Sequence, residues 1–168
     1  MNRQNSSTAG FSLMELIVLI GIVGLLAAVS LPQLRTMAED FRLKGAARDI
    51  LSYFQKAKME AVKRGANVAL NFTPGNPGSF VMFIDNGADE GTPDDFIRNG
   101  GEELLGEVTL PKGILFDSTT FSADRTGFGV NGLPKKLGRV KLANANDKKY
   151  QIILSMTGNV RLENKWGD

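Results

Sequence analysis

The side chains that could do chemistry in this chain are mostly carboxylates, because its 168 residues include no histidine and no cysteine. This absence removes the commonest general base, thiol nucleophiles, disulfides and the usual nitrogen and sulfur ligands of zinc. The pairs Asp94-Asp95 and Glu102-Glu103 are adjacent along the chain, and we interpret them as solvated surface residues. We therefore predict that the chain is not an enzyme, with a hydrolase that uses two carboxylates as the remote alternative.

Another group of carboxylates lies in the glycine-rich stretch 85–95, within the region 85–101 that shows no regular pattern. Oxygen ligands in a flexible loop can wrap a calcium ion. The candidate ligands are Asp85, Asp89, Asp94 and Asp95. The spacing is not that of an EF-hand, because Gly87 and Phe96 stand where that loop needs an oxygen donor and a bidentate glutamate. An acidic, solvated loop at a subunit interface explains the same residues without an ion. We therefore predict that the chain has no cofactor, with calcium as the less favoured alternative.

A third pattern, residues 127–132, matches the letters of the dinucleotide fingerprint G-x-G-x-x-G. The fingerprint needs a helix directly after it and a parallel βαβ unit around it. Here a segment broken by Pro134 and Gly138 follows, so we interpret these glycines as turn residues. The balance of 20 Lys and Arg against 18 Asp and Glu creates no strong field, and we expect no nucleic acid partner.

Glu15 is an isolated carboxylate at the head of an apolar stretch. Residues 16–34 carry no charge, and their number is close to the about 20 residues that cross a bilayer core. A charge inside such a span costs on the order of 3 kcal/mol near the bilayer centre unless it finds a partner. Nothing nearby offers one, so the stretch is interpreted as a single membrane span with an anomalous acid. Pro32 should break the local hydrogen-bond ladder and bend or loosen the span.

The first ten residues form a short polar segment with one positive charge and a glycine at its end. A leader of this kind, then Gly10, Phe11-Ser12-Leu13-Met14-Glu15 and the span, resembles the class III signal of type IV prepilins and type II secretion pseudopilins. The resemblance implies that a prepilin peptidase cleaves between Gly10 and Phe11 and methylates the new Phe11 amine. It also implies assembly into a helical filament, in which Glu15 meets the Phe11 amine of a neighbouring subunit and Pro32 serves assembly. The alternative is an ordinary membrane anchor with an incidental acid.

Beyond the span, apolar residues recur every three or four positions, which is typical of an amphipathic helix. They are Leu43, Ala47, Ile50, Phe54, Ala57 and Ala61. One long helix is predicted from Phe11 to Arg64, with Gly65 as its terminator. Short apolar or alternating segments then predict strands. They are Val68–Phe72, Phe80–Ile84, Leu104–Val108, Ile114–Phe116, Thr119–Phe121, Phe128–Val130, Val140–Leu142, Tyr150–Ser155 and Val160–Glu163.

A helix followed by many short strands indicates an α+β fold, with an antiparallel sheet packed on the second half of the helix. The last two predicted strands should form a hairpin around residues 157–159. The predicted segments are a leader (1–10), a membrane or filament-core helix (11–34), an amphipathic helix (35–65) and a β-rich head (66–168). The head residues 81–87, 98–105, 131–134 and 155–162 resemble those of the GspH/FimT group of minor pseudopilins and minor pilins.

The resemblance implies a structural subunit that is inserted in the bacterial inner membrane with its head in the periplasm. Its partners would be membrane lipid, the prepilin peptidase and methyltransferase, the inner-membrane assembly platform and other pilin or pseudopilin subunits. The expected function is that of a minor pseudopilin of a type II secretion system, which joins or primes a pseudopilus. A minor pilin of a type IV pilus, of the FimT or FimU kind, is the alternative, and a membrane-anchored periplasmic enzyme is the remote one.

Replacement of Gly10 by a bulky residue such as leucine is expected to block removal of the leader, because the peptidase must approach the backbone closely at the scissile bond. Mass spectrometry of membrane fractions should then show the precursor that starts at Met1. The unaltered chain should start at Phe11 and carry one added methyl group, whereas an intact Met1 in the assembled protein would contradict this assignment.

Overall fold

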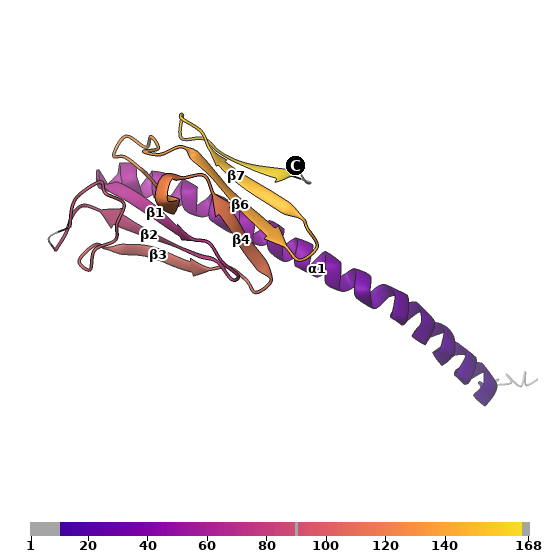
Figure 1. Cartoon of the computed structure of the whole chain (residues 1–168). Helices are drawn as coiled ribbons and strands as arrows, with labels where there is room; N and C mark the ends of the chain where they lie inside the picture. Colours follow the sequence, from indigo (N-terminus) through magenta and orange to yellow (C-terminus); the bar gives the residue numbers. More distant parts are fainter. Residues whose placement is uncertain (1–10, 90, 166–168) are drawn as a thin grey trace, which may run out of the picture. The chain divides into compact units, whose positions relative to one another are not determined.

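The computed structural model describes residues 11–89 and 91–165, and it divides into two compact units, with the boundary between Met37 and Ala38. A long helix, α1 (Leu13–Arg64), supplies residues to both units, and eight strands follow it in the second (Figure 1). The strands are β1 (Asn67–Thr73), β2 (Ser79–Asp85), β3 (Leu104–Thr109), β4 (Ile114–Thr119), β5 (Arg125–Phe128), β6 (Gly138–Asn144), β7 (Lys149–Leu154) and β8 (Val160–Lys165). The predicted α+β class is confirmed.

The part of α1 in the second unit is amphipathic, and its buried face is the predicted stripe. The buried residues are Leu43, Ala46, Ala47, Ile50, Phe54, Ala57 and Ala61. Alanines at four of these positions let the strands approach the helix backbone closely. The helix ends as predicted at Gly65, whose φ of 61° is the left-handed conformation that suits glycine. Ala66 N–H donates to the Ala61 carbonyl at 3.3 Å, the bond of a Schellman motif.

The strands form two antiparallel sheets, and the prediction of one sheet was wrong. The first sheet has the order β3-β2-β1-β5 and the second has the order β4-β6-β7-β8. An isolated bridge between Gly75 and Phe116 connects the sheets at one point. The alternation of apolar residues fixes which face of a strand is buried but not which strand lies beside it. That is why the sequence could not separate one sheet from two.

One hydrophobic cluster joins α1 to the inner faces of both sheets. Phe54 of α1 is fully buried at its centre, and its ring lies 5.8 Å from that of Phe72, 6.2 Å from Phe121 and 6.4 Å from Phe128. Phe72 belongs to β1 and also packs edge-on against Phe116 of β4, at 5.7 Å. The aromatic rings therefore connect the helix with the first sheet and the first sheet with the second.

Two predicted strands were placed wrongly. The segment Thr119–Phe121 is not a strand of its own, because Thr119 ends β4 and a short 3₁₀ turn (Ser122–Asp124) follows Phe121. The strand predicted at Phe128–Val130 lies earlier, at Arg125–Phe128. Glycine is uncommon in strands, so Gly127 was interpreted as a turn residue. In the structure a Cβ at this position would lie 2.5 Å from the Val68 carbonyl, so β5 needs glycine there.

The remaining turn predictions are confirmed. β7 and β8 pair as an antiparallel hairpin, and Ser155 N–H donates to the Asn159 carbonyl at 3.0 Å across its turn. The segment 127–132 runs from β5 into a turn in which Gly132 has a φ of 71°. No helix follows it within the described residues, so the turn interpretation holds for residues 129–132, whereas Gly127 belongs to β5.

Replacement of Phe54 by alanine is expected to lower the free energy of unfolding by about 3–5 kcal/mol, because it empties the centre of the larger of the two hydrophobic clusters in the described residues. The measurement is urea unfolding of a fragment that begins at residue 35. We expect this fragment to be soluble and cooperatively folded, since the buried hydrophobic residues in the described part of the chain all lie beyond Met37.

Met59→Ala is the matched control on the same helix, because its side chain is 64% exposed. It should change the free energy of unfolding by no more than about 0.5 kcal/mol. Equal losses in the two variants, or a fragment that aggregates, would show that the core has been misplaced.

Candidate functional site

The start of α1 holds the residues that the sequence singled out for assembly. Gly10 lies outside the described residues, whereas Phe11 is described and is 77% exposed. The first helical hydrogen bond runs from Leu16 N–H to the Ser12 carbonyl at 3.1 Å. Ser12 therefore stands at the N-cap and Glu15 at the third helical position. The sequence reasoning missed that Ser12 and Glu15 have the spacing of a capping box.

Glu15 is exposed in the first turn of α1, where the helix dipole favours a negative charge. None of the ion pairs within residues 11–89 and 91–165 involves Glu15. The residues that follow are apolar, and the large ones among them are all exposed. The geometry is thus compatible with two roles for Glu15. It can stabilise the start of the helix, and its carboxylate can pair with a cation from another molecule.

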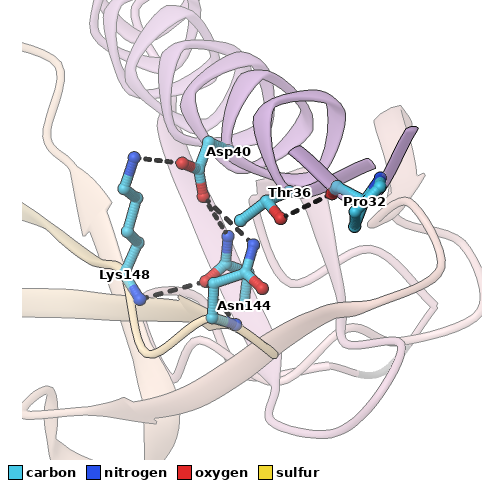
Figure 2. A network of polar contacts seen from close by, with 6 residues as sticks. Pro32, Thr36, Asp40, Asn144 and Lys148 are labelled. Carbon is cyan, nitrogen blue, oxygen red and sulfur yellow. Dashed lines mark hydrogen bonds and ion pairs between the residues drawn. The ribbon is translucent and has the colours of Figure 1, made fainter. Parts of the chain in front are cut away.

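The apolar first half of α1 is continuous and solvent-exposed. It is long and apolar enough to cross a membrane, and the span carries no buried residue. Pro32 lies inside the helix and is exposed. Because proline has no N–H, the Ala28 carbonyl loses its usual donor at this point. The Thr36 hydroxyl donates to the Pro32 carbonyl at 3.0 Å (Figure 2). The Ser30 hydroxyl donates to the Leu26 carbonyl at 2.8 Å.

Asp40, which the sequence reasoning did not single out, joins α1 to the turn between β6 and β7 (Figure 2). Its carboxylate forms an ion pair with Lys148 and accepts hydrogen bonds from the side-chain amides of Asn144, at 2.8 Å, and Asn146, at 3.4 Å. The Asn144 side-chain oxygen in turn accepts the backbone N–H groups of Asn146 and Lys148. The turn is therefore shaped by Asn144 and held to the helix by Asp40.

The same contacts lower the pKa of Asp40 below its ordinary value, chiefly through the hydrogen bond from Lys148 and against the opposing effect of desolvation. No sequence signal could have found this group, because Asp40 is 104 residues from Asn144 and 108 from Lys148. We refer to Asp40, Asn144, Asn146 and Lys148 as the Asp40 clamp.

The acidic loop after β2 is organised by two buried carboxylates. Asp85, at the end of β2, is only 1% exposed, and its two oxygens accept the backbone N–H groups of Asp94 at 2.9 Å and Phe96 at 3.0 Å. Burial raises the pKa of Asp85 above its ordinary value, and the two backbone hydrogen bonds oppose that rise. Our interpretation of this loop as solvated was therefore wrong for Asp85, which fixes the backbone of its own loop.

Glu102 acts in the same way from the other end of the loop. It is 2% exposed and accepts the backbone N–H groups of Asn99 at 2.8 Å and Gly87 at 3.2 Å. The interpretation of Glu102-Glu103 as a solvated pair was therefore wrong for Glu102. A local sequence pattern could not reveal this, because the donors are backbone groups that any residue carries. Glu103 is exposed and pairs with Arg64 at 2.8 Å.

Phe96 anchors this loop on the outer face of the first sheet. Its ring is buried with Ala69 and Phe83, and the missing Cβ of Gly127 leaves room for the edge of the ring. The Lys136 ammonium lies 4.8 Å from the ring centroid, in cation–π contact. The loop is therefore attached to β1, β2 and β5.

The four predicted calcium ligands do not gather around a common point. Asp85 already bonds backbone N–H groups, and Asp94 pairs with Lys135 at 2.7 Å. Within the described residues, no cluster of three or more carboxylates is placed to hold a metal ion. As arranged, Asp85, Asp89, Asp94 and Asp95 do not fit calcium, and calcium binding by this loop stays a prediction that would require rearrangement.

Comparison with known proteins agrees with this geometry. A model of the family described as type II transport protein GspH matches residues 46–158. Among curated proteins, the pilin-like protein PilA1 of Thermus thermophilus is 33% identical over 79 residues, which are 47% of this chain and 49% of that protein. The matched part thus spans about half of that relative's length.

Two solved structures share the fold at low sequence identity. The minor pseudopilin EpsH of the Vibrio cholerae type 2 secretion system has a TM-score of 0.55 at 14% identity, covering 78% of this chain and 99% of that one. The type IV minor pilin FimU of Pseudomonas aeruginosa has a TM-score of 0.53 at 14% identity, covering 76% of this chain and 92% of that one. The long helix packed on two antiparallel sheets is therefore a pilin-like fold.

Replacement of Asp40 by asparagine is expected to lower the melting temperature at neutral pH by a few degrees, because it removes the charge that pairs with Lys148. The folded state holds the pKa of Asp40 below its ordinary value of 3.8, so its stabilising effect is present above that pH and is lost as the pH falls below it. The difference between the variant and the unaltered chain should therefore shrink in acid, which thermal unfolding across pH would measure.

Asp49→Asn is the control for this experiment. Asp49 is an exposed carboxylate of the same helix with no side-chain ion pair in the described part of the chain. Its replacement should leave the melting temperature nearly unchanged at every pH. A loss equal to that of Asp40→Asn would mean that the clamp contributes nothing specific.

Proposed function

The chain belongs to the family of the type II transport protein GspH, and from this premise we propose that it is a minor pseudopilin of a type II secretion system. The observation that carries the proposal is the family match over residues 46–158, a region that includes most of the head. Relatives of this fold are structural subunits that assemble with other pilin-like subunits, and the proposed function is accordingly structural, without catalysis. The subunit joins or primes a periplasmic pseudopilus.

The proposed course begins with a precursor in the inner membrane. Residues 1–10 are the leader, residues 11–34 span the bilayer, and residues 35–168 form the periplasmic part with its amphipathic helix and β-rich head. The prepilin peptidase removes the leader and methylates Phe11, and the assembly platform then receives the mature subunit. The exposed apolar half of α1 supports this course, because an unbroken helix satisfies its own backbone hydrogen bonds in lipid.

The proposed role of Glu15 is to pair with the Phe11 amine of a neighbouring subunit. Cleavage at Gly10 would create that amine four residues before Glu15, close to the helix start in every subunit. In the filament core the carboxylate would be surrounded by apolar side chains, where an unpaired charge is costly. The pairing therefore links processing to assembly, since an uncleaved subunit has no amine to offer at Phe11.

A type IV pilus minor pilin is the alternative. The likeness to FimU, with a TM-score of 0.53, is nearly equal to the likeness to EpsH at 0.55, so the fold supports both machines. The family match favours secretion. Deletion of the gene would separate the two, because loss of protein secretion with intact twitching supports the pseudopilin and the reverse supports the minor pilin.

Glu15→Gln is expected to be inserted and cleaved but to fail in filament incorporation, because it keeps a side-chain acceptor at the third helical position and removes only the charge. Glu15→Val should fail in the same way. Immunoblotting of sheared or isolated filaments measures incorporation, and the N-terminus of the membrane form shows whether cleavage took place.

Ser12→Ala is the control that isolates helix capping. It removes the N-cap side chain and leaves the Glu15 charge, so incorporation should be close to normal. Normal incorporation of Glu15→Gln together with failure of Ser12→Ala would contradict the proposed pairing of Glu15 with the Phe11 amine. Glu15 would then only stabilise the start of the helix.

A further inference from the structure

Phe41 is an aromatic side chain of α1 that the head leaves uncovered. It is 66% exposed, whereas Leu43 and Phe54 are fully buried and Tyr53 packs partly buried against the core. The large residues that follow on the same helix with high exposure, Met59 and Val62, are not aromatic. Most of the Phe41 surface is therefore available for contact with a partner outside the head.

The position of Phe41 along the chain limits what it can reach. It follows Leu34, the last residue of the apolar stretch, by seven residues, and α1 is unbroken between them. Seven helical residues rise about 10 Å, and the headgroup layer adds roughly 5–8 Å on each side of the hydrocarbon core. In a chain anchored by residues 11–34, the Cα atom of Phe41 consequently lies just outside that layer. Helical side chains tilt toward the N-terminus of their helix, so the Phe41 ring points back into the outer part of the layer, where aromatic side chains are enriched.

The Asp40 clamp holds the β6–β7 turn beside the part of α1 that carries Phe41. Asp40 is the residue before Phe41, and it holds the β6–β7 turn through Asn144, Asn146 and Lys148 (Figure 2). Ala145, Asn146 and Asp147 of this turn are exposed. Consecutive helical residues point about 100° apart, because a turn takes 3.6 residues. Asp40 can therefore hold the turn while Phe41 projects from another side of the helix.

The charged residues near Phe41, on α1 and on the β6–β7 turn, favour contact with a surface that carries phosphate groups. Its acids are Glu39, Asp40 and Asp147, and its cations are Arg42, Lys44, Lys148 and Lys149. Lys148 pairs with Asp40, and Lys149 pairs with Asp147 at 3.3 Å. Arg42 and Lys44 are exposed and form no ion pair within residues 11–89 and 91–165. Their long side chains can reach lipid phosphates while their stems lie along apolar material.

We propose that Phe41, Arg42, Lys44 and the β6–β7 turn form a contact with the phospholipid headgroups of the membrane before the subunit is assembled. The Phe41 ring enters the outer part of the headgroup layer, Arg42 and Lys44 bind phosphates, and the turn rests on that layer. This rests on the membrane-inserted state of the proposed function. Extraction of the subunit into a filament must break this contact.

The test uses the whole chain in vesicles of phosphatidylethanolamine and phosphatidylglycerol. Because the chain has no cysteine, single nitroxide-labelled cysteines can be placed at Phe41, Ala145, Met59 and Val23. Electron paramagnetic resonance then measures how often each label collides with oxygen, which concentrates in lipid, and with a water-soluble nickel chelate. Met59 is the matched control, since its exposure of 64% is close to the 66% of Phe41 and it lies eighteen residues farther along α1.

We expect the labels at Phe41 and Ala145 to collide with the nickel chelate several-fold less often than the label at Met59, and the label at Val23 to be rich in oxygen collisions. Asp40→Ala should restore collisions at Ala145 and leave Phe41 protected, because it releases only the turn. Equal nickel collisions at Phe41, Ala145 and Met59, with Val23 still in lipid, would overturn the headgroup contact and leave the proposed function intact. Protection of Phe41 that needs added pilin subunits would overturn it in favour of a protein contact, and a water-exposed Val23 would overturn both proposals.

Discussion

The structure depends on the burial of one helix face against two sheets at once. Within residues 11–89 and 91–165 the two sheets share no ladder of hydrogen bonds, and an isolated bridge between Gly75 and Phe116 connects them. What holds them in one body is the cluster around Phe54, in which Phe72 packs on both the helix and β4. Burial of a large apolar side chain is worth about 1.5–3 kcal/mol. The aromatic rings therefore replace the disulfide that a chain without cysteine cannot form.

Within the head, polar contacts fix the shape of the loop after β2 and of the short turn between β6 and β7. Asp85 and Glu102 bind the backbone N–H groups of the loop after β2, and Phe96 attaches that loop to the outer face of the first sheet. Asp40 holds the β6–β7 turn to the helix. Asp85 and Glu102 position the backbone directly, whereas Asp40 acts through the side chains of Asn144, Asn146 and Lys148.

Much of this architecture follows from periodicity that is visible in the sequence. The spacing of Leu43 to Ala61 gave the buried face of α1, and Gly65 gave its end, because both depend on contacts within a few turns. The number of sheets and the strand at Arg125–Phe128 could not be predicted, since they depend on which distant strands meet and on the close approach of Val68 to Gly127. The burial of Asp85 and Glu102 and the clamp at Asp40 depend on partners far away in sequence or on backbone donors. No local pattern carries that information.

The central claim is that this chain is a subunit of a filament, in which processing at Phe11 supplies the cation for Glu15. The most direct measurement is quantitative mass spectrometry of purified pseudopili from cells that express the chain at its natural level. The account predicts that the chain is recovered with the filaments and that its recovered form begins at Phe11 with a methylated amine. Filaments that are complete in their other subunits but lack this chain, or that contain it with residues 1–10 attached, would contradict the account.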